Sequence, residues 1–128
     1  MLSKAVSLGI LLLSGEHARA HYAFVLATGA AALGRNVTLF ATNTGCHALL
    51  ADWSGLADAG RDGVLVARGV AGLDVLREAA MELGIRLLVC ESGLRGEGLE
   101  TRIMLPGVEI AGVATFLAAV GGGQLLSL

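Results

Sequence analysis

Short runs of apolar residues alternate along this chain with longer segments in which apolar positions recur at helical spacing. Uninterrupted apolar runs predict strands covered on both faces, because a strand with one wet face would alternate apolar and polar residues. The second run, NVTLFAT, is also rich in the β-branched and aromatic residues that strands favour. We expect five strands, at residues 5–14, 36–42, 85–90, 108–111 and 124–128.

Helical spacing between these strands predicts three main helices, at residues 17–33, 73–83 and 113–120. Gly34 and Gly84 follow the first two and are typical helix ends. A short helix is expected at 47–53, and a loop or short extension at 54–70, where four glycines interrupt any pattern. Three further glycines make 91–98 a predicted flexible turn.

Strands that alternate with helices indicate parallel βαβ units with helices on both faces of the sheet. The sequence therefore predicts an α/β fold in one domain that spans residues 1–128. Ligand and catalytic chemistry in such sheets lies at the carboxyl ends of the strands. The segments to search for a site are therefore 14–17, 42–47, 90–98 and 111–112.

Composition narrows the class of protein. Hydrophobic residues make up 55% and charged residues 16% of the chain, which excludes intrinsic disorder. A net charge of −2 and only five aromatic residues argue against a nucleic-acid surface. The longest uncharged stretch, 110–128, is interrupted by three glycines, so no membrane span is expected. Helices that are apolar on more than one face instead predict a homo-oligomer.

The chain begins like a secretory signal, with Lys4 before an apolar run and Ala18-Arg19-Ala20 as a possible cleavage motif. Charged residues crowd that motif, and cleavage there would remove the first predicted strand. Two cysteines, 44 positions apart, form no disulfide framework. We expect a cytoplasmic protein with two free thiols.

No cofactor or metal is expected. A dinucleotide fingerprint requires three spaced glycines after the first strand, but this chain has a single Gly15 followed by Glu16 there. His17 and His21 stand four residues apart on the first predicted helix and could present two imidazoles on one face. No third ligand follows in register, so two exposed histidines at a helix start are the simpler interpretation.

Cys90 is the strongest candidate for chemistry, because it is the last residue of the third predicted strand. A thiol near a cation and a helix N-terminus has a lowered pKa and is a better nucleophile. Arg95 is the first cation after Cys90, in the turn that follows the strand, whereas the carboxylate of Glu91 disfavours the thiolate. Cys90 could equally pack as a small apolar residue. Gly93, in the predicted turn that follows, is expected to line the same site as Cys90.

Cys46 follows the second predicted strand, and His47 is its neighbour. An incidental loop thiol is the favoured interpretation. A disulfide-exchange enzyme is disfavoured because the chain has no C-x-x-C motif. A redox sensor remains open, in which Cys46 resolves a sulfenate on Cys90 if the two loops approach closely enough.

Three stretches together resemble the DsrE/DsrF-like sulfur-carrier family, which includes the TusD-type sulfurtransferase subunits. They read GILLLSGEHARAHYAFVLATGAAALGRNVTLFATNTG, LREAAMELGIRLLVCESGL, and VEIAGVATFLAAV with the final QLLSL. The resemblance implies a three-layer α/β/α fold with a mainly parallel five-stranded sheet. It also implies homo- or hetero-oligomers, and we expect a trimer or a hexamer. Cys46 beside His47 departs from the common family pattern.

The resemblance further implies that Cys90 accepts sulfane sulfur as a persulfide and passes it to a partner. On this hypothesis the protein is a sulfur relay with sulfur-donor and sulfur-acceptor protein partners. Arg95 and, less directly, His47 would stabilise the thiolate. The rival hypothesis is a non-catalytic assembly or small-ligand-binding module, in which the apolar helices build an oligomer and Cys90 only packs.

Overall fold

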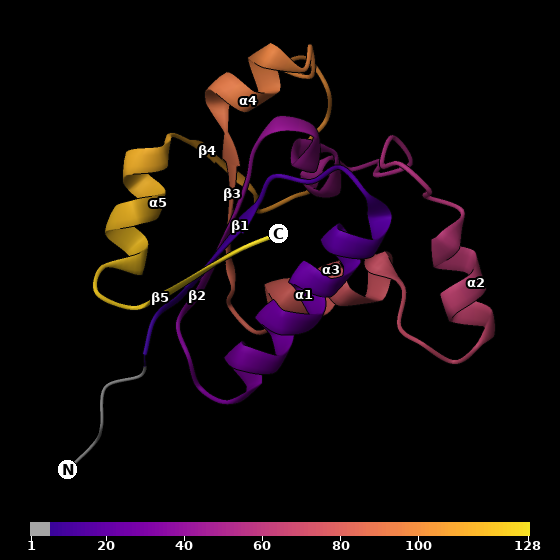
Figure 1. Ribbon diagram of the computed structural model, residues 1–128, viewed down its shortest axis with the longest axis horizontal. Helices are drawn as coiled ribbons and strands as arrows, with labels where there is room; N and C mark the ends of the chain where they lie inside the picture. The colour runs from indigo at the N-terminus through magenta and orange to yellow at the C-terminus, as the bar shows by residue number, and fades with distance from the viewer. Residues whose placement is uncertain (1–5) are drawn as a thin grey trace.

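The computed structural model describes residues 6–128 and has an α/β architecture around one five-stranded, all-parallel sheet (Figure 1). The strand order is β4-β3-β2-β1-β5. Every neighbouring pair is parallel, which confirms the predicted fold class. The strands are β1 (Leu8–Leu12), β2 (Val37–Ala41), β3 (Arg86–Cys90), β4 (Glu109–Ala111) and β5 (Gln124–Ser127).

Helices cover both faces of this sheet and give it three layers (Figure 1). On one face lie α1 (His17–Ala32) and α3 (Leu73–Glu82), which pack side by side. The other face carries α5 (Val113–Val120), which packs on β1 and β2. The three main helices and all five strands thus fall where apolar spacing predicts them, with ends shifted by a few residues.

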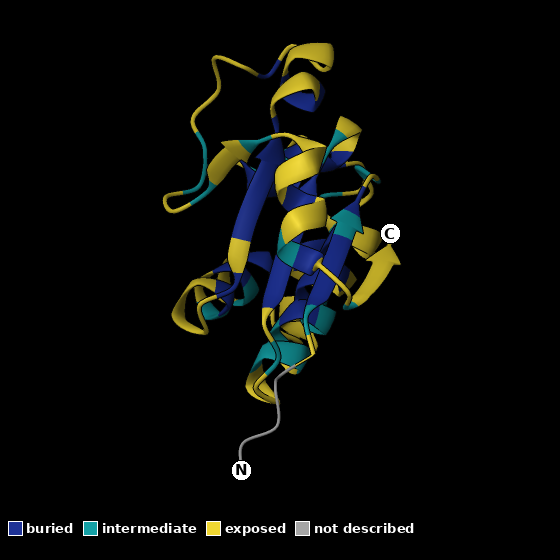
Figure 2. Cartoon of the chain, turned by 90° about the vertical axis from the view of Figure 1, so that its left-hand side faces the viewer, coloured by how far each residue is buried: buried dark blue, intermediate teal, exposed yellow. Residues whose placement is uncertain are grey.

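The central strands are buried because their residues point into one of two apolar clusters. Ile10 and Leu39 are fully buried toward α1 and α3. On the opposite side Phe116 of α5 stacks on Phe40, with ring centroids 5.0 Å apart. Gly9 allows this close approach, since a Cβ there would lie 2.2 Å from Val120 Cγ2. The blue strands behind the largely yellow outer surface of α5 show this burial in Figure 2.

Two glycine-rich segments are more regular than the sequence predicts. The expected loop at 54–70 contains α2 (Arg61–Ala67), and the expected turn at 91–98 contains α4 (Glu91–Gly96). Gly69 and Gly98, both at positive φ, directly follow the C-cap residues of these helices, Arg68 and Glu97. They serve as helix ends rather than as flexible linkers, because glycine adopts that conformation without strain. The short helix expected at 47–53 is instead η1, a 3-10 helix at Asn43–Leu49.

The two histidines of α1 are buried, so their interpretation as exposed residues is wrong. His17 is fully buried, and its Nε2 lies 2.7 Å from Oδ1 of Asp62. The same Asp62 oxygen accepts a hydrogen bond from the Leu73 N–H at the start of α3. His21 Nε2 lies 2.8 Å from the Ala71 carbonyl oxygen. These contacts fasten α2 and the loop before α3 onto α1.

The first residues of the chain carry two of the sequence-based expectations. Lys4 of the signal-like motif and Ala5, the expected start of the first strand, lie outside the described residues. Among residues 6–128, no helix is both long enough and apolar enough to cross a membrane.

Candidate functional site

Cys90 ends β3 and is at the same time the N-cap residue of α4. Parallel strands align their carboxyl ends, so the residue lies at the sheet edge where such folds place their chemistry. It pairs in register with Ala111 of β4. Its side chain joins the cluster beneath α5, and 8% of the residue is exposed. A reagent therefore reaches this thiol only from the end of the sheet.

Several donors surround the sulfur of Cys90. The Gly93 N–H donates to Sγ at 3.3 Å, and the Ser92 hydroxyl lies 3.2 Å from it. Burial raises the pKa of the Cys90 thiol, but hydrogen bonds from Ser92, Thr42 and the backbone N–H of Gly93 outweigh it. The net effect is a pKa below the ordinary value, because each of these bonds favours the thiolate.

The wall behind the thiol is η1, and Gly93 is the point where α4 touches it. A Cβ on Gly93 would lie 2.7 Å from Thr42 Oγ1, 3.0 Å from the Asn43 nitrogen and 3.2 Å from Cys46 Sγ. Only a residue without a side chain brings α4 this close to η1. The absence of a side chain at Gly93 thus helps to position the N–H that contacts Cys90.

Cys46 lies near Cys90, but the pKa of its thiol is shifted in the opposite direction. It is fully buried, and its Sγ lies 3.8 Å from the Ala41 carbonyl oxygen. Burial, reinforced by the nearby Cys90 and Glu97, raises the pKa of the Cys46 thiol to about 12. The two cysteines are free, and Gly93 contacts both. Cys46 is therefore a protonated packing thiol at neutral pH.

The structure brings Cys90, Gly93 and Cys46 together but directs Arg95 and His47 elsewhere. Arg95 Nη2 donates to Glu91 Oε1 at 2.5 Å on the exposed side of α4. His47 lies against Gly55 and lines a separate hollow with Ser14, Gly15 and Thr44, among others. The groups that lower the pKa of Cys90 are hydroxyls and backbone N–H groups.

Arg77 of α3 holds η1 in place from below. Its buried guanidinium donates to the carbonyl oxygens of Ala48, Leu50 and Ala51 at 3.1, 2.5 and 3.0 Å. Burial lowers the pKa of Arg77 below its ordinary value, because it outweighs the opposite effect of the nearby carboxylates of Asp74 and Asp52. The wall that carries Thr42 and Cys46 is thus fixed by a charged side chain of another layer.

Two functional contacts, Thr42 and Ser92, were missed from the sequence. The Ser92 hydroxyl, in the first turn of α4, lies 3.2 Å from Cys90 Sγ. The Thr42 hydroxyl, which follows β2, donates to Asn43 Oδ1 at 3.3 Å and also lowers the pKa of Cys90. The one available signal was Ser92 two residues after a strand-end cysteine, and it becomes readable only if a helix begins at Glu91. Thr42 is 48 positions away and is brought in by the β2–β3 pairing alone.

The arrangement suits nucleophilic sulfur chemistry. A thiolate held by neutral donors at the surface can attack an electrophilic sulfur or carbon without a separate base. Within residues 6–128, no three His, Cys, Asp or Glu side chains cluster as they would around a metal ion.

Known proteins share this architecture. The crystal structure of the YchN protein from E. coli superposes with a TM-score of 0.71 at 14% identity, covering 98% of this chain and all of that one. The chain therefore shares the fold of YchN. A protein of unknown function from Methanobacterium thermoautotrophicum, MTH1491, matches with a TM-score of 0.57 at 16% identity over 96% of this chain and 99% of its own.

One curated relative also matches in sequence. The uncharacterized protein YrkE of Bacillus subtilis (strain 168) is 29% identical over 147 aligned positions, which cover 91% of this chain and 92% of YrkE. No protein-family model matches the chain. These likenesses show the fold; what Cys90 does is argued from its surroundings.

Proposed function

We propose that this protein is a sulfur-relay protein of the DsrE/DsrF-like family, which carries sulfane sulfur as a persulfide on Cys90. The single observation that carries the proposal is the donor set around Cys90 Sγ. The Ser92 hydroxyl and the backbone N–H of Gly93, at 3.2 and 3.3 Å from the sulfur, favour the thiolate at the carboxyl end of the sheet. A cysteine that served only to pack would need no such donors.

The transfer balances without an oxidant. The Cys90 thiolate attacks the outer sulfur of a donor persulfide, so that a new S–S bond forms on Sγ. The donor's own S–S bond breaks, and the donor leaves as a thiolate. In the second step an acceptor thiolate attacks the outer sulfur on Cys90. The Cys90–sulfur bond then breaks, and its electron pair regenerates the Cys90 thiolate.

The same donors suit both steps. They stabilise Cys90 as the attacking thiolate at the beginning and as the leaving group at the end, and a thiol of lower pKa leaves faster. Cys46 is a poor substitute, because it is fully buried and its pKa is raised to about 12. Donor and acceptor would be proteins that present a cysteine at the exposed end of the sheet.

Intact mass after incubation with a persulfide donor, before and after reductant, tests the proposal. The comparison uses the wild-type protein, Cys90→Ser and the matched control Cys46→Ser. We expect wild type and Cys46→Ser to gain sulfur that reductant removes, and Cys90→Ser to gain none.

Two outcomes would overturn this assignment. Loss of sulfur uptake in both variants would indicate a two-cysteine mechanism instead of a carrier built on Cys90 alone. No uptake by the wild-type protein would favour a non-catalytic assembly module in which Cys90 packs. Circular dichroism of each variant establishes that it is folded before its mass is interpreted.

A further inference from the structure

The edge strand β5 differs from the opposite edge of the sheet. Its four residues, QLLS, are all exposed and carry no charge. At the other edge, β4 has three residues, and Glu109 is held by two hydrogen bonds from Arg86 of β3, at 2.8 and 3.1 Å. Natural sheets protect edges with charge, proline or short strands, and β5 has neither charge nor proline.

Backbone groups on the outer side of β5 lack a strand partner among the described residues. The N–H groups of Gln124 and Leu128 donate inward, to Ser7 and Leu11 on the β1 side. Because backbone groups alternate in direction along a strand, Leu125 and Ser127 direct theirs outward. The surface thus offers two N–H and two C=O groups in strand geometry, which is what another strand requires.

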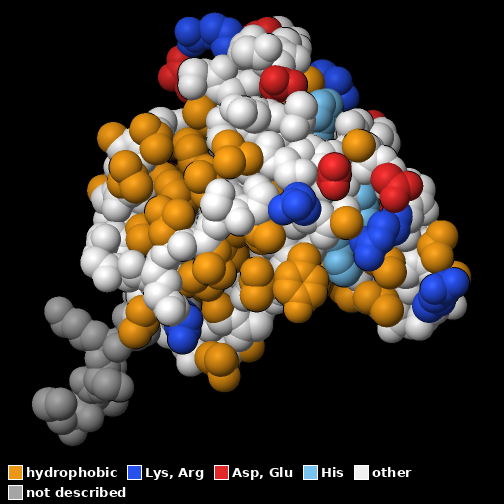
Figure 3. Space-filling view, in the orientation of Figure 1, with side chains coloured by type: hydrophobic (Ala, Val, Ile, Leu, Met, Phe, Trp, Pro, Cys, Tyr) orange, Lys and Arg blue, Asp and Glu red, His pale blue; other side chains and the backbone are white. Residues whose placement is uncertain are grey.

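Apolar surface continues from this edge onto the helices on both sides. Figure 3 looks onto the β5 edge and shows hydrophobic side chains over α5, β5 and α1. The largest exposed fractions are 83% at Leu33 and 54% at Tyr22 of α1, 44% at Leu125, 41% at Leu126, and 56% at Val113 and 52% at Leu117 of α5. At about 150 Å² for a large side chain, they offer roughly 500 Å² per protomer, most of the ~800 Å² that each partner buries in a standard interface.

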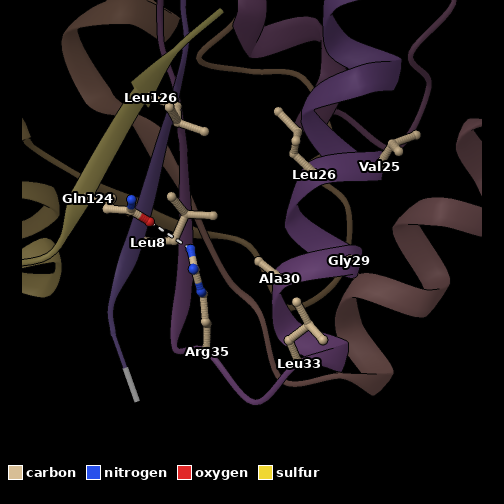
Figure 4. Close-up of a pocket in the computed structure, with 9 residues that line it drawn as sticks. All are labelled: Leu8, Val25, Leu26, Gly29, Ala30, Leu33, Arg35, Gln124 and Leu126. Atoms are coloured by element: carbon tan, nitrogen blue, oxygen red, sulfur yellow. Dashed lines mark hydrogen bonds between the residues drawn. The ribbon is translucent and has the colours of Figure 1, made fainter. Parts of the chain in front are cut away.

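Between β5 and α1 this surface is hollowed into a groove of about 340 Å³ (Figure 4). Leu26, Ala30 and Leu33 form its helix wall, and Leu8 and Leu126 form its sheet wall. The one charged lining residue, Arg35, donates to Gln124 Oε1 at 2.6 Å. The rest of the lining is uncharged, so a copy of the chain can cover the groove while Arg35 remains bonded to Gln124 at its margin.

We propose that the β5 edge is the interface between two copies of this chain, joined by antiparallel β5–β5 pairing about a two-fold axis at Leu126. In this register Leu125 of each copy pairs with Ser127 of the other, so all four outward groups of each strand are satisfied. Both Leu126 side chains then meet beside the groove, and the two sheets become one of ten strands. The two α1 helices lie on the same face and cover each other's grooves.

Light scattering during size-exclusion chromatography measures the result. The wild-type protein should have twice the 13.0-kDa mass of the chain, or an even multiple of it. Leu126→Glu places two carboxylates on the axis and should weaken association roughly 100-fold or more. Ser127→Pro removes an outward N–H and should weaken association too, while it leaves the inward bonds of Gln124 and Leu128 intact. The matched control, Val75→Glu, changes an exposed residue of α3 and should leave the mass unchanged.

Hydrogen exchange of the β5 amides tests whether this strand is the one that pairs in the oligomer. The amides of Leu125 and Ser127 should be protected in the wild-type protein and should exchange fast in Leu126→Glu. A wild-type monomer, or an oligomer that survives both edge substitutions, would overturn the proposal and leave the edge to a different partner. Because the edge lies on β5 and the thiol on β3, folded Leu126→Glu should keep the Cys90 reactivity of wild type, so failure here is separate from failure of the sulfur relay.

Discussion

Gly93 donates its backbone N–H to Cys90 Sγ at 3.3 Å, and the same residue has no room for a side chain. A Cβ there would collide with Thr42 Oγ1, the Asn43 nitrogen and Cys46 Sγ. The contact that keeps α4 against η1 is therefore also the one that places a donor on the thiol. Packing and sulfur chemistry depend on the same glycine.

Gly93→Ala should reduce both the stability of the fold and the reactivity of Cys90. The new methyl group meets backbone as well as side chains, so α4 must move away from η1 and the hydrogen bond to Cys90 lengthens. We expect a loss of about 1–3 kcal/mol in the free energy of unfolding. We also expect a Cys90 pKa closer to the ordinary value. Denaturant unfolding and the pH profile of Cys90 alkylation measure the two effects.

Gly96→Ala is the matched control, because it makes the same change at the end of the same helix. Nothing lies within 4 Å of a Cβ at that position. The substitution should stabilise α4 by about 0.5–1 kcal/mol and leave the reactivity of Cys90 unchanged. An equal loss of stability in both variants would contradict the role given to Gly93.

The alkylation rate of Cys90 should rise with pH through a midpoint below that of an ordinary thiol, which is about 8.5. The sign follows from the thiolate being the nucleophile, and from a lowered pKa that populates it at lower pH. Ser92→Ala removes a bond to the thiolate, and Thr42→Val removes a hydroxyl that lowers the pKa of Cys90, so each should move the midpoint to higher pH. Iodoacetamide kinetics between pH 5 and pH 10, followed by mass, measure it.

Arg95→Ala separates this explanation from the one suggested by the sequence. The Arg95 guanidinium pairs with Glu91 on the exposed side of α4. Its removal should therefore shift the midpoint less than Ser92→Ala does. A larger shift in Arg95→Ala would mean that charge, rather than hydrogen bonding, controls the thiol.

The sequence predicts the sheet well because strands that are buried on both faces are uninterrupted apolar runs. Leu8–Leu12 and Val37–Ala41 are continuous apolar runs, and they pair with each other at the centre. The same property places Cys90 at the carboxyl end of the third strand. The glycines of 54–70 and 91–98 predict irregular segments, but both segments contain a helix, and Gly69 and Gly98 lie just past the helix ends.

The hydrogen-bond donors around Cys90 could not be predicted from the sequence, for a different reason. Thr42 reaches Cys90 only because β2 and β3 are neighbours in the sheet, and Gly93 is restricted by residues nearly 50 positions away. Closeness in sequence to a cysteine is what makes Arg95 and His47 predicted site residues. On a helix, however, neighbours in sequence point in different directions, so Arg95 pairs with Glu91 and His47 packs against Gly55.

Arg77→Met should destabilise the wall behind the thiol. The substitution keeps the apolar stem but removes the donors to Ala48, Leu50 and Ala51, and it leaves buried carbonyl oxygens unpaired. We expect a cost of about 2–4 kcal/mol in the free energy of unfolding. The control Arg68→Met changes an exposed residue and should cost about 0.5 kcal/mol or less. Similar values for the two variants would show that Arg77 does not fasten η1.

Cys46 should be inert as long as the protein is folded. Its thiol is fully buried, and its pKa is raised to about 12, so it stays protonated at neutral and moderately alkaline pH. The shift stabilises the fold below the unfolded pKa of about 8.5, and this contribution declines as the pH rises toward 12. Native protein should therefore take up one alkyl group, on Cys90, and a second only at the rate of unfolding.

Denaturant gives the decisive version of this experiment. The slow modification of Cys46 should accelerate with denaturant in parallel with global unfolding, whereas the fast modification of Cys90 should not. Mild oxidation should likewise leave the two thiols unlinked, because Cys46 is fully buried and its raised pKa keeps it from supplying the thiolate that attacks an oxidised Cys90. Rapid formation of a Cys46–Cys90 disulfide in native protein would contradict the packing role of Cys46. It would favour the redox sensor, in which Cys46 resolves a sulfenate on Cys90.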